Sequence, residues 1–354
     1  MAVAAAAGVG IATITGFGAI PASAGTAPMH VVQTISSAYV GPLQFAVQGR
    51  SIYVADSALS KLFKVGRSSP IASGPAPDPT NPEASGDLAG VSATDDAIAY
   101  TTTTADHKDT RLTILSHGHK QIVSLSTFEK RANPDKRNVY GLVDADDVSR
   151  ACKAEMRKIG LPTSPYRGMY DSHPYAVAAL GDGAWAVADA GGNDVLKVDR
   201  SGHVSVLAVL PPQPLRVSSS FASQNGVPDC VGATFRFEPV PTDVEVGPHG
   251  QLFVTTLSAA PGPSGSVWKL SHGCAYRIAT GFLGATNLAV TPDGRIFVAQ
   301  LFAGTIAQVH DGHGVTVATL PGVAAVEWAN GHLYASTAPA VTGGSGPGTI
   351  VRLG

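Results

Sequence analysis

The feature that most constrains the fold of this chain is a repeated pattern of short apolar runs separated by turn signals. The clearest copy, HPYAVAALGDGAWAVADAGGNDVLKVDRSGHVSVLAVLP at 173–211, contains four such runs. Gly in the separators takes positive φ without steric cost, and Asp or Asn there bonds its own backbone. The copy therefore predicts a four-stranded antiparallel meander, which needs neighbouring copies to bury both of its faces.

Five further copies follow the same order of inner strand, turn, second strand and outer strands. They lie at 41–65, 86–125, 241–280, 284–320 and 322–354. The chain also has 40 Gly and 25 Pro with only 14% charged residues, a turn-rich composition typical of such repeats. We therefore predict an all-β, six-bladed β-propeller, closed by the strand HVVQTIS at 30–36, which pairs with the last copy.

Residues 1–24 have the pattern of a signal peptide. Ala2–Ile20 is apolar and small, and Ala22-Ser23-Ala24 matches an A-x-A cleavage site. A transmembrane anchor is the alternative. No Lys or Arg precedes the apolar run, which leaves open a start upstream of Met1. We expect a secreted protein whose residues 25–354 form one propeller domain with no membrane span after cleavage.

Two stretches exceed the length of a bare repeat, at about 126–172 and 212–240, and we call them the first and second long segments. Both fall between an outer strand and the next inner strand. In a propeller these connections emerge on one face, so the sequence predicts two same-face insertions that act as a lid. The first should contain a short helix, VSRACKAEMRKI, capped by Asp146 or Asp147 and ended by Gly160.

The chain has three cysteines, and an exported protein meets an oxidising compartment. Cys152 and Cys230 fall in the two long segments, whereas Cys274 lies in a turn expected on the opposite face. We predict a disulfide between Cys152 and Cys230, with Cys274 left free.

One position near the entrance of each inner strand should line the central channel. Aligning PLQFAV, PTDVEV and ATNLAV places Gln44, Asp243 and Asn287 there, and the other copies offer Ala. Oxygen-bearing side chains in a ring can hold a hard divalent cation, Ca²⁺ or Mg²⁺, with Asp243 and Asn287 as ligands. Alternatively, the three satisfy loop backbone and channel water.

Further candidates lie where inner strands begin, at the mouth of the channel. Asp87 starts the second inner strand, His173 and Tyr175 start the third, and Glu238 precedes the fourth. A His beside an acid such as Asp171 can act as a base, although Asp and His-Pro also suit a turn before a strand. The acidic turn 189–194 and the HGH and HDGH sequences at 117–119 and 310–313 are interpreted as turns rather than metal sites.

Charge and motifs exclude several classes. The net charge is −2 and no basic stripe is present, which argues against nucleic acid as a partner. The sequence contains no P-loop, no G-x-S-x-G motif and no C-x-x-C motif.

The blocks PYAVAALGDGAWAVADAGGNDVLKV, VPTDVEVGPHGQLFVTTL and NLAVTPDGRIFVAQ resemble the ScyD/ScyE family of exported propeller proteins. The resemblance covers about 42–354 and extends more distantly to NHL and SMP-30/gluconolactonase propellers. It implies a six-bladed fold and secretion, and no settled activity. The lactonase relatives hold a channel metal with Glu, Asn and Asp, whereas Gln44 here has no acid near it.

These observations favour a monomeric protein that binds a small molecule, a glycan or a protein at the face covered by the long segments. The alternative is a metal-dependent enzyme of the lactonase or lyase type, with Asp243 and Asn287 as channel ligands. A third reading is an envelope scaffold that needs only the blade surfaces.

Overall fold

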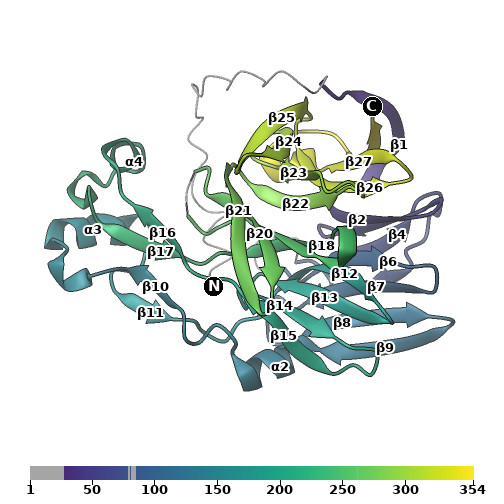
Figure 1. The fold of residues 1–354 in the computed structure, drawn as a ribbon, viewed down its shortest axis with the longest axis horizontal. Coiled ribbons are helices and arrows are strands. Elements are labelled where there is room, and N and C mark those ends of the chain that lie inside the picture. Colours follow the sequence, from purple (N-terminus) through teal and green to yellow (C-terminus); the bar gives the residue numbers. More distant parts are fainter. Residues whose placement is uncertain (1–27, 79, 81–84, 261) are drawn as a thin grey trace.

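The computed structural model describes residues 28–78, 80, 85–260 and 262–354; the predicted signal peptide lies outside them. The described chain is all-β, with seven four-stranded antiparallel sheets (Figure 1). Five sheets use four strands in sequence order. They are β2 Pro42–Gln48, β3 Ser51–Asp56, β4 Lys61–Lys64, β5 Ala72–Ser73; β6 Asp87–Ala93, β7 Ala97–Thr103, β8 Thr110–Ser116, β9 His119–Ser124; β12 Pro174–Gly181, β13 Ala184–Asp189, β14 Asp194–Val198, β15 Val204–Val209; β18 Pro241–Val246, β19 Leu252–Thr256, β20 Gly265–Ser271, β21 Cys274–Phe282; and β22 Ala285–Val290, β23 Ile296–Gln300, β24 Thr305–His310, β25 His313–Thr319.

A sixth sheet joins the two ends of the described chain. It contains β26 Val323–Ala329, β27 His332–Thr337, β28 Gly348–Leu353 and β1 Val31–Tyr39. Val31 of β1 pairs with Leu353 of β28, and Thr34 pairs with Val351, so the predicted pairing of the N-terminal strand with the last copy is confirmed.

The first strands of these six sheets contact one another in a closed cycle. Its order is β2, β6, β12, β18, β22, β26 and back to β2. Small residues suit such crowded inner strands: β12 reads PYAVAALG, and Ala176 and Ala178 are buried. Outer strands such as β21 are instead mostly exposed or half-buried, with only Ala279 and Phe282 buried, because they lie at the solvent edge of their sheet. The apolar core lies between neighbouring sheets, as where Leu112 and Trp185 pack together.

The hairpin turns follow the local sequence. Asp182-Gly183, Asp311-Gly312 and Asn330-Gly331 all have positive φ at both residues, the conformation of a tight type I′ hairpin. His117-Gly118 does the same, so the HGH sequence is a turn, as interpreted above.

The two long segments build a seventh sheet, which we call the composite sheet (Figure 1). The first segment contributes β10 Val139–Leu142 and β11 Pro165–Arg167, and the second contributes β16 Gln213–Arg216 and β17 Thr234–Phe237. In Figure 1 the composite sheet projects to the left of the other sheets. It has its own apolar core, which includes Met156, Phe235 and Phe237.

Helices in the long segments differ from the single one predicted. The first segment has α2 Leu125–Ala132 and α3 Arg150–Lys158, and the second has α4 Ser219–Asn225. Helix α3 is capped by the Ser149 hydroxyl, which accepts from the Cys152 N–H at 3.0 Å. The predicted cap at Asp146 or Asp147 is therefore wrong, because both residues belong to a 3₁₀ turn, Ala145–Asp147, that precedes the helix.

The predicted disulfide is present: Cys152 on α3 is bonded to Cys230 in the second segment, with a Cα–Cα distance of 4.7 Å. It links the two segments within the core of the composite sheet. Cys274 is free and exposed, as predicted. Among the described residues, no helix is long and apolar enough to cross a membrane.

Candidate functional site

Gln44, Asp243 and Asn287, the three predicted channel residues, lie together and are each 3% exposed. Asn287 Nδ2 donates to Gln44 Oε1 at 2.8 Å, and Asn287 Oδ1 accepts from the Val326 N–H at 2.7 Å. Gln44 Nε2 donates to the Thr242 carbonyl at 3.2 Å. These bonds connect four of the inner strands, because the residues come from β2, β18, β22 and β26.

Asp243 joins the same network through its carboxylate, which accepts from the Leu288 N–H at 2.8 Å. Burial raises the pKa of Asp243 to about 7, although backbone hydrogen bonds oppose the shift. In this geometry both ends of the Gln44 and Asn287 amides already have partners. The three side chains thus satisfy backbone and side-chain hydrogen-bonding groups of the inner strands, which was the alternative to metal binding. A cation in the channel stays a prediction.

A second level of carboxylates, missed from the sequence, lies two residues further along the inner strands. Glu245 follows Asp243 on β18, and Glu327 lies on β26. Burial and the neighbouring acids raise the pKa of Glu245 well above its usual value, and burial with Asp243 raises that of Glu327 to about 8. The sequence alone could have predicted this second level, because residues i and i+2 of a strand point to the same face and Glu245 is two residues after Asp243.

Two of the predicted channel-mouth residues, His173 and Asp87, form a His–carboxylate pair, and Asp171 forms a second pair with His107. His173 Nε2 lies 3.2 Å from Asp87 Oδ2, and His107 Nδ1 lies 2.7 Å from Asp171 Oδ1. The two imidazole rings are in contact, with centroids 4.9 Å apart, and Tyr175 meets His173 edge-on at 6.0 Å. His107, in the turn between β7 and β8, was missed because nothing in its own copy distinguishes it from a surface turn.

The charges of these pairs stabilise each other. Burial lowers the pKa of His173, but the charge and hydrogen bond of Asp87, with the charges of Asp189 and Asp171, together make the net shift upward. Burial raises the pKa of Asp171, but the hydrogen bond and charge of His107 outweigh it and the net shift is downward. Burial and nearby acids raise the pKa of Tyr175, which keeps its phenol protonated.

The mouth has unused hydrogen-bonding capacity. His173 Nδ1 and Asp87 Oδ1 are both buried and have no hydrogen-bond partner among the described residues. The His173 side chain is 11% exposed and that of Asp87 is 20% exposed, so solvent still reaches the pair. An imidazole with one nitrogen on a carboxylate and the other unpartnered can bind a ligand hydroxyl or act as a base.

Glu238, which follows β17 directly, bonds to the composite sheet and not to this pair. Its carboxylate accepts from the Tyr166 hydroxyl at 2.9 Å, and burial raises its pKa. Tyr166 belongs to β11, so this bond connects the first long segment to the residue that precedes β18. The structure does not bring Glu238 into contact with His173.

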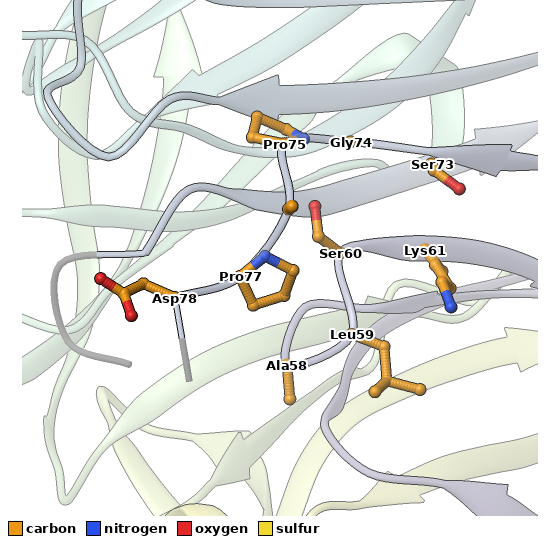
Figure 2. Close-up of a pocket in the computed structure, with 10 residues that line it drawn as sticks. Ala58, Leu59, Ser60, Lys61, Ser73, Gly74, Pro75, Pro77 and Asp78 are labelled. Atoms are coloured by element: carbon orange, nitrogen blue, oxygen red, sulfur yellow. The ribbon is translucent and has the colours of Figure 1, made fainter. Parts of the chain in front are cut away.

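A cavity of about 560 Å³ lies elsewhere, beside the turn between β3 and β4 (Figure 2). Its lining is Ala58, Leu59, Ser60, Lys61, Ser73, Gly74, Pro75, Ala76, Pro77 and Asp78. Small apolar side chains and prolines dominate this surface, and it contains none of the predicted site residues. We assign the candidate site to the channel mouth instead, because chemistry needs the polar groups that gather there.

In the part of the chain that the structure describes, no group of three or more His, Cys, Asp or Glu side chains stands in a metal-binding arrangement. A metal held by three such protein ligands is therefore not preformed at the mouth or in the channel.

Comparison with known proteins shows the fold. No family model matches the chain, and no curated protein matches it. The chain is similar to the PQQ-bound aldose sugar dehydrogenase of Streptomyces coelicolor, with 14% identity, a TM-score of 0.55, and coverage of 92% of this chain and 99% of that one. It is also similar to a putative oxidoreductase (glucose dehydrogenase) of Thermus thermophilus, with 15% identity, a TM-score of 0.53, and coverage of 92% and 99%.

A gluconolactonase of Xanthomonas campestris gives 11% identity, a TM-score of 0.51, and coverage of 96% and 98%. At such low identities these likenesses establish a propeller-type arrangement of small antiparallel sheets, and nothing about activity.

Proposed function

We propose that this chain is a six-bladed, exported propeller of the ScyD/ScyE type that binds a small hydroxylated or amine-bearing ligand at its channel mouth. The closed cycle of six inner strands supports the blade count, and the disulfide fits an oxidising compartment. The long segments, which build the composite sheet, act as the same-face insertions predicted from the sequence.

The observation that carries the binding proposal is the unused hydrogen-bonding capacity of His173 and Asp87. Asp87 Oδ1 can accept a hydrogen bond, and His173 Nδ1 accepts one when the imidazole is neutral and donates one when it is protonated. A buried polar atom without a partner costs free energy, so a ligand that donates to it gains affinity. Hydroxyl and amine groups are donors of this kind, which favours a small polar molecule or a glycan over a flat protein surface.

A thermal-shift screen tests the proposal with a panel of monosaccharides, glycan fragments and small amines. A ligand at about 100 times its Kd stabilises the folded protein by roughly 2.7 kcal/mol. We expect that a stabilising compound loses its effect in His173→Phe and Asp87→Asn. His310→Asn is the matched control, because this His is 60% exposed in the β24–β25 hairpin and pairs with Asp311 rather than with His173 or Asp87. Equal stabilisation of wild type and His173→Phe would refute the mouth as the binding site.

The metal-dependent lactonase or lyase is the second candidate function. The second level of acids favours it, because Glu245 and Glu327 add two carboxyl groups beside Asp243 whose protons a bound cation would displace. If it is correct, a divalent cation should stabilise the chelator-treated wild type and lose that effect in Asp243→Asn. Lactone hydrolysis should then depend on the same cation.

A further inference from the structure

Four carboxylates are buried at the junction between the first long segment and the β12–β15 sheet. Glu129 lies on α2 and Asp135 follows that helix, while Asp189 and Asp194 flank the β13–β14 turn and pair directly across it. All four are at most 1% exposed. A concentration of like charge this deep in a protein requires compensation.

Turn chemistry fully accounts for Asp189. Its carboxylate accepts from the Ser172 hydroxyl and the His173 N–H, both at 2.6 Å, and from the N–H groups of Gly191 and Gly192 at 3.1 and 3.0 Å. Asp189 is therefore part of a turn, as its sequence predicts.

Glu129 and Asp194 lack comparable hydrogen bonds. Each is 0% exposed, and none of their four carboxylate oxygens has a well-formed hydrogen bond among the described residues. The Asp171 backbone N–H lowers the pKa of Glu129 a little, but it does not offset the burial of the carboxyl group. The groups that act most strongly on their charges are other carboxylates, so burial and repulsion raise the pKa of Glu129 to about 9 and that of Asp194 well above its usual value. No hydrogen bond joins these two side chains, so a shared proton does not explain them either.

Unpartnered neutral oxygen lies next to Glu129. Asn133 caps α2 in a left-handed conformation, and its backbone N–H donates to the Glu129 carbonyl at 2.7 Å. Asn133 Nδ2 donates to the Gly168 carbonyl at 3.2 Å, and its Oδ1 is buried without a partner. Asp135 Oδ1 is unpartnered as well.

We propose that Glu129 and Asp194 bind a divalent cation, Ca²⁺ by the chemistry of the donors, together with the Asn133 amide oxygen. Carboxylate and amide oxygens are the ligands that Ca²⁺ takes, and its flexible coordination accepts neutral oxygens and water beside two acids. This donor set agrees with the finding that no three acidic, His or Cys side chains of the described residues already converge on a metal. The site is separate from the channel residues Asp243 and Asn287.

The bound cation would join α2 of the first long segment to the β13–β14 turn. Asp189 in that turn holds the backbone of His173, so the cation would also stabilise the position of the mouth. The proposal is independent of the proposed function, because the site exists whether or not the mouth binds a ligand.

The test uses the full chain, treated with a chelator and then titrated with CaCl₂ and, separately, MgCl₂ by isothermal calorimetry and thermal unfolding. We expect one Ca²⁺ per chain, and at least a tenfold weaker affinity in Glu129→Gln and in Asp194→Asn. Asp96→Asn, at a side chain that is 79% exposed, is the control and should bind as wild type does, whereas Asp243→Asn shows whether a cation in the channel contributes. Atomic emission on dialysed wild type counts the metal without relying on any variant.

Three results would overturn the proposal. One is that millimolar Ca²⁺ or Mg²⁺ neither binds nor stabilises the chelated wild type. Another is that affinity is unchanged in both Glu129→Gln and Asp194→Asn. The last is loss of binding in Asp243→Asn alone, which would place the cation in the channel. Because Gln and Asn remove charge at nearly constant volume, both variants should fold at least as stably as metal-free wild type.

Discussion

Replacing Asn287 by Ala should destabilise the ring of inner strands by more than the loss of a few side-chain atoms would suggest. The substitution removes the donor to Gln44 Oε1 and the acceptor of the Val326 N–H, leaving two buried polar groups unpaired. Each such group costs about 1–3 kcal/mol, so the free energy of unfolding should fall by roughly 2–6 kcal/mol. Urea unfolding, followed by tryptophan fluorescence and analysed from the midpoint at constant slope, measures this loss.

Two comparisons make the reasoning refutable. Gln48→Ala, on the same strand as Gln44, removes an exposed bond to Asp95 and should cost at most about 0.5 kcal/mol. In the double variant Gln44→Ala/Asn287→Ala, neither partner is left facing the other, so the loss should be smaller than the sum of the single losses by about 1 kcal/mol. If Asn287→Ala costs no more than Gln48→Ala, or if the two losses simply add, the network does not fasten the inner strands.

Other perturbations give separate tests. The pKa of Glu327 is raised to about 8 in the folded chain, above its unfolded value. The folded state therefore loses this proton at a higher pH than the unfolded state does, and stability should fall as pH rises from about 5 to 8. Glu327→Gln should flatten this pH dependence in thermal melts of the chelated protein. Removing the disulfide with Cys152→Ser/Cys230→Ser frees a loop of 78 residues and should cost the composite sheet about 3–5 kcal/mol, seen as faster hydrogen exchange there while the other sheets stay protected. Gly348→Ala should weaken the closing sheet, because a Cβ at this position would clash with the Pro42 ring; a Tm that falls by less than about 1–2 °C, which corresponds to a loss below roughly 0.5 kcal/mol, would contradict this.

Most of the strand order was predictable because each copy encodes its own hairpins. Gly and Asp at the turns set the register locally, and period-two apolar runs mark the buried faces. The composite sheet was not predictable in this way. Its strands are three or four residues long, and β10 must pair with β17 from a segment about 90 residues away, so no local pattern announces it.

The site was predictable to a similar extent. Alignment of the copies brought Gln44, Asp243 and Asn287 to one level, because equivalent positions of repeated strands lie at equivalent places around the channel. His107 could not be predicted, because its partner Asp171 lies in a different loop, 64 residues away. Contact between two loops depends on the complete fold.

The pairing of β1 with β28 has a consequence for how the chain matures. Val31 of β1 pairs with Leu353 of β28, so the last sheet cannot form until the C-terminal strand has been synthesised. Until then β1 offers unpaired N–H and C=O groups to any neighbouring chain, and β27 lacks its partner. A folding helper that shields β1 during synthesis would therefore act on the same edge that later closes the ring, and swapping of β1 between two chains is the characteristic error to expect when many copies emerge together.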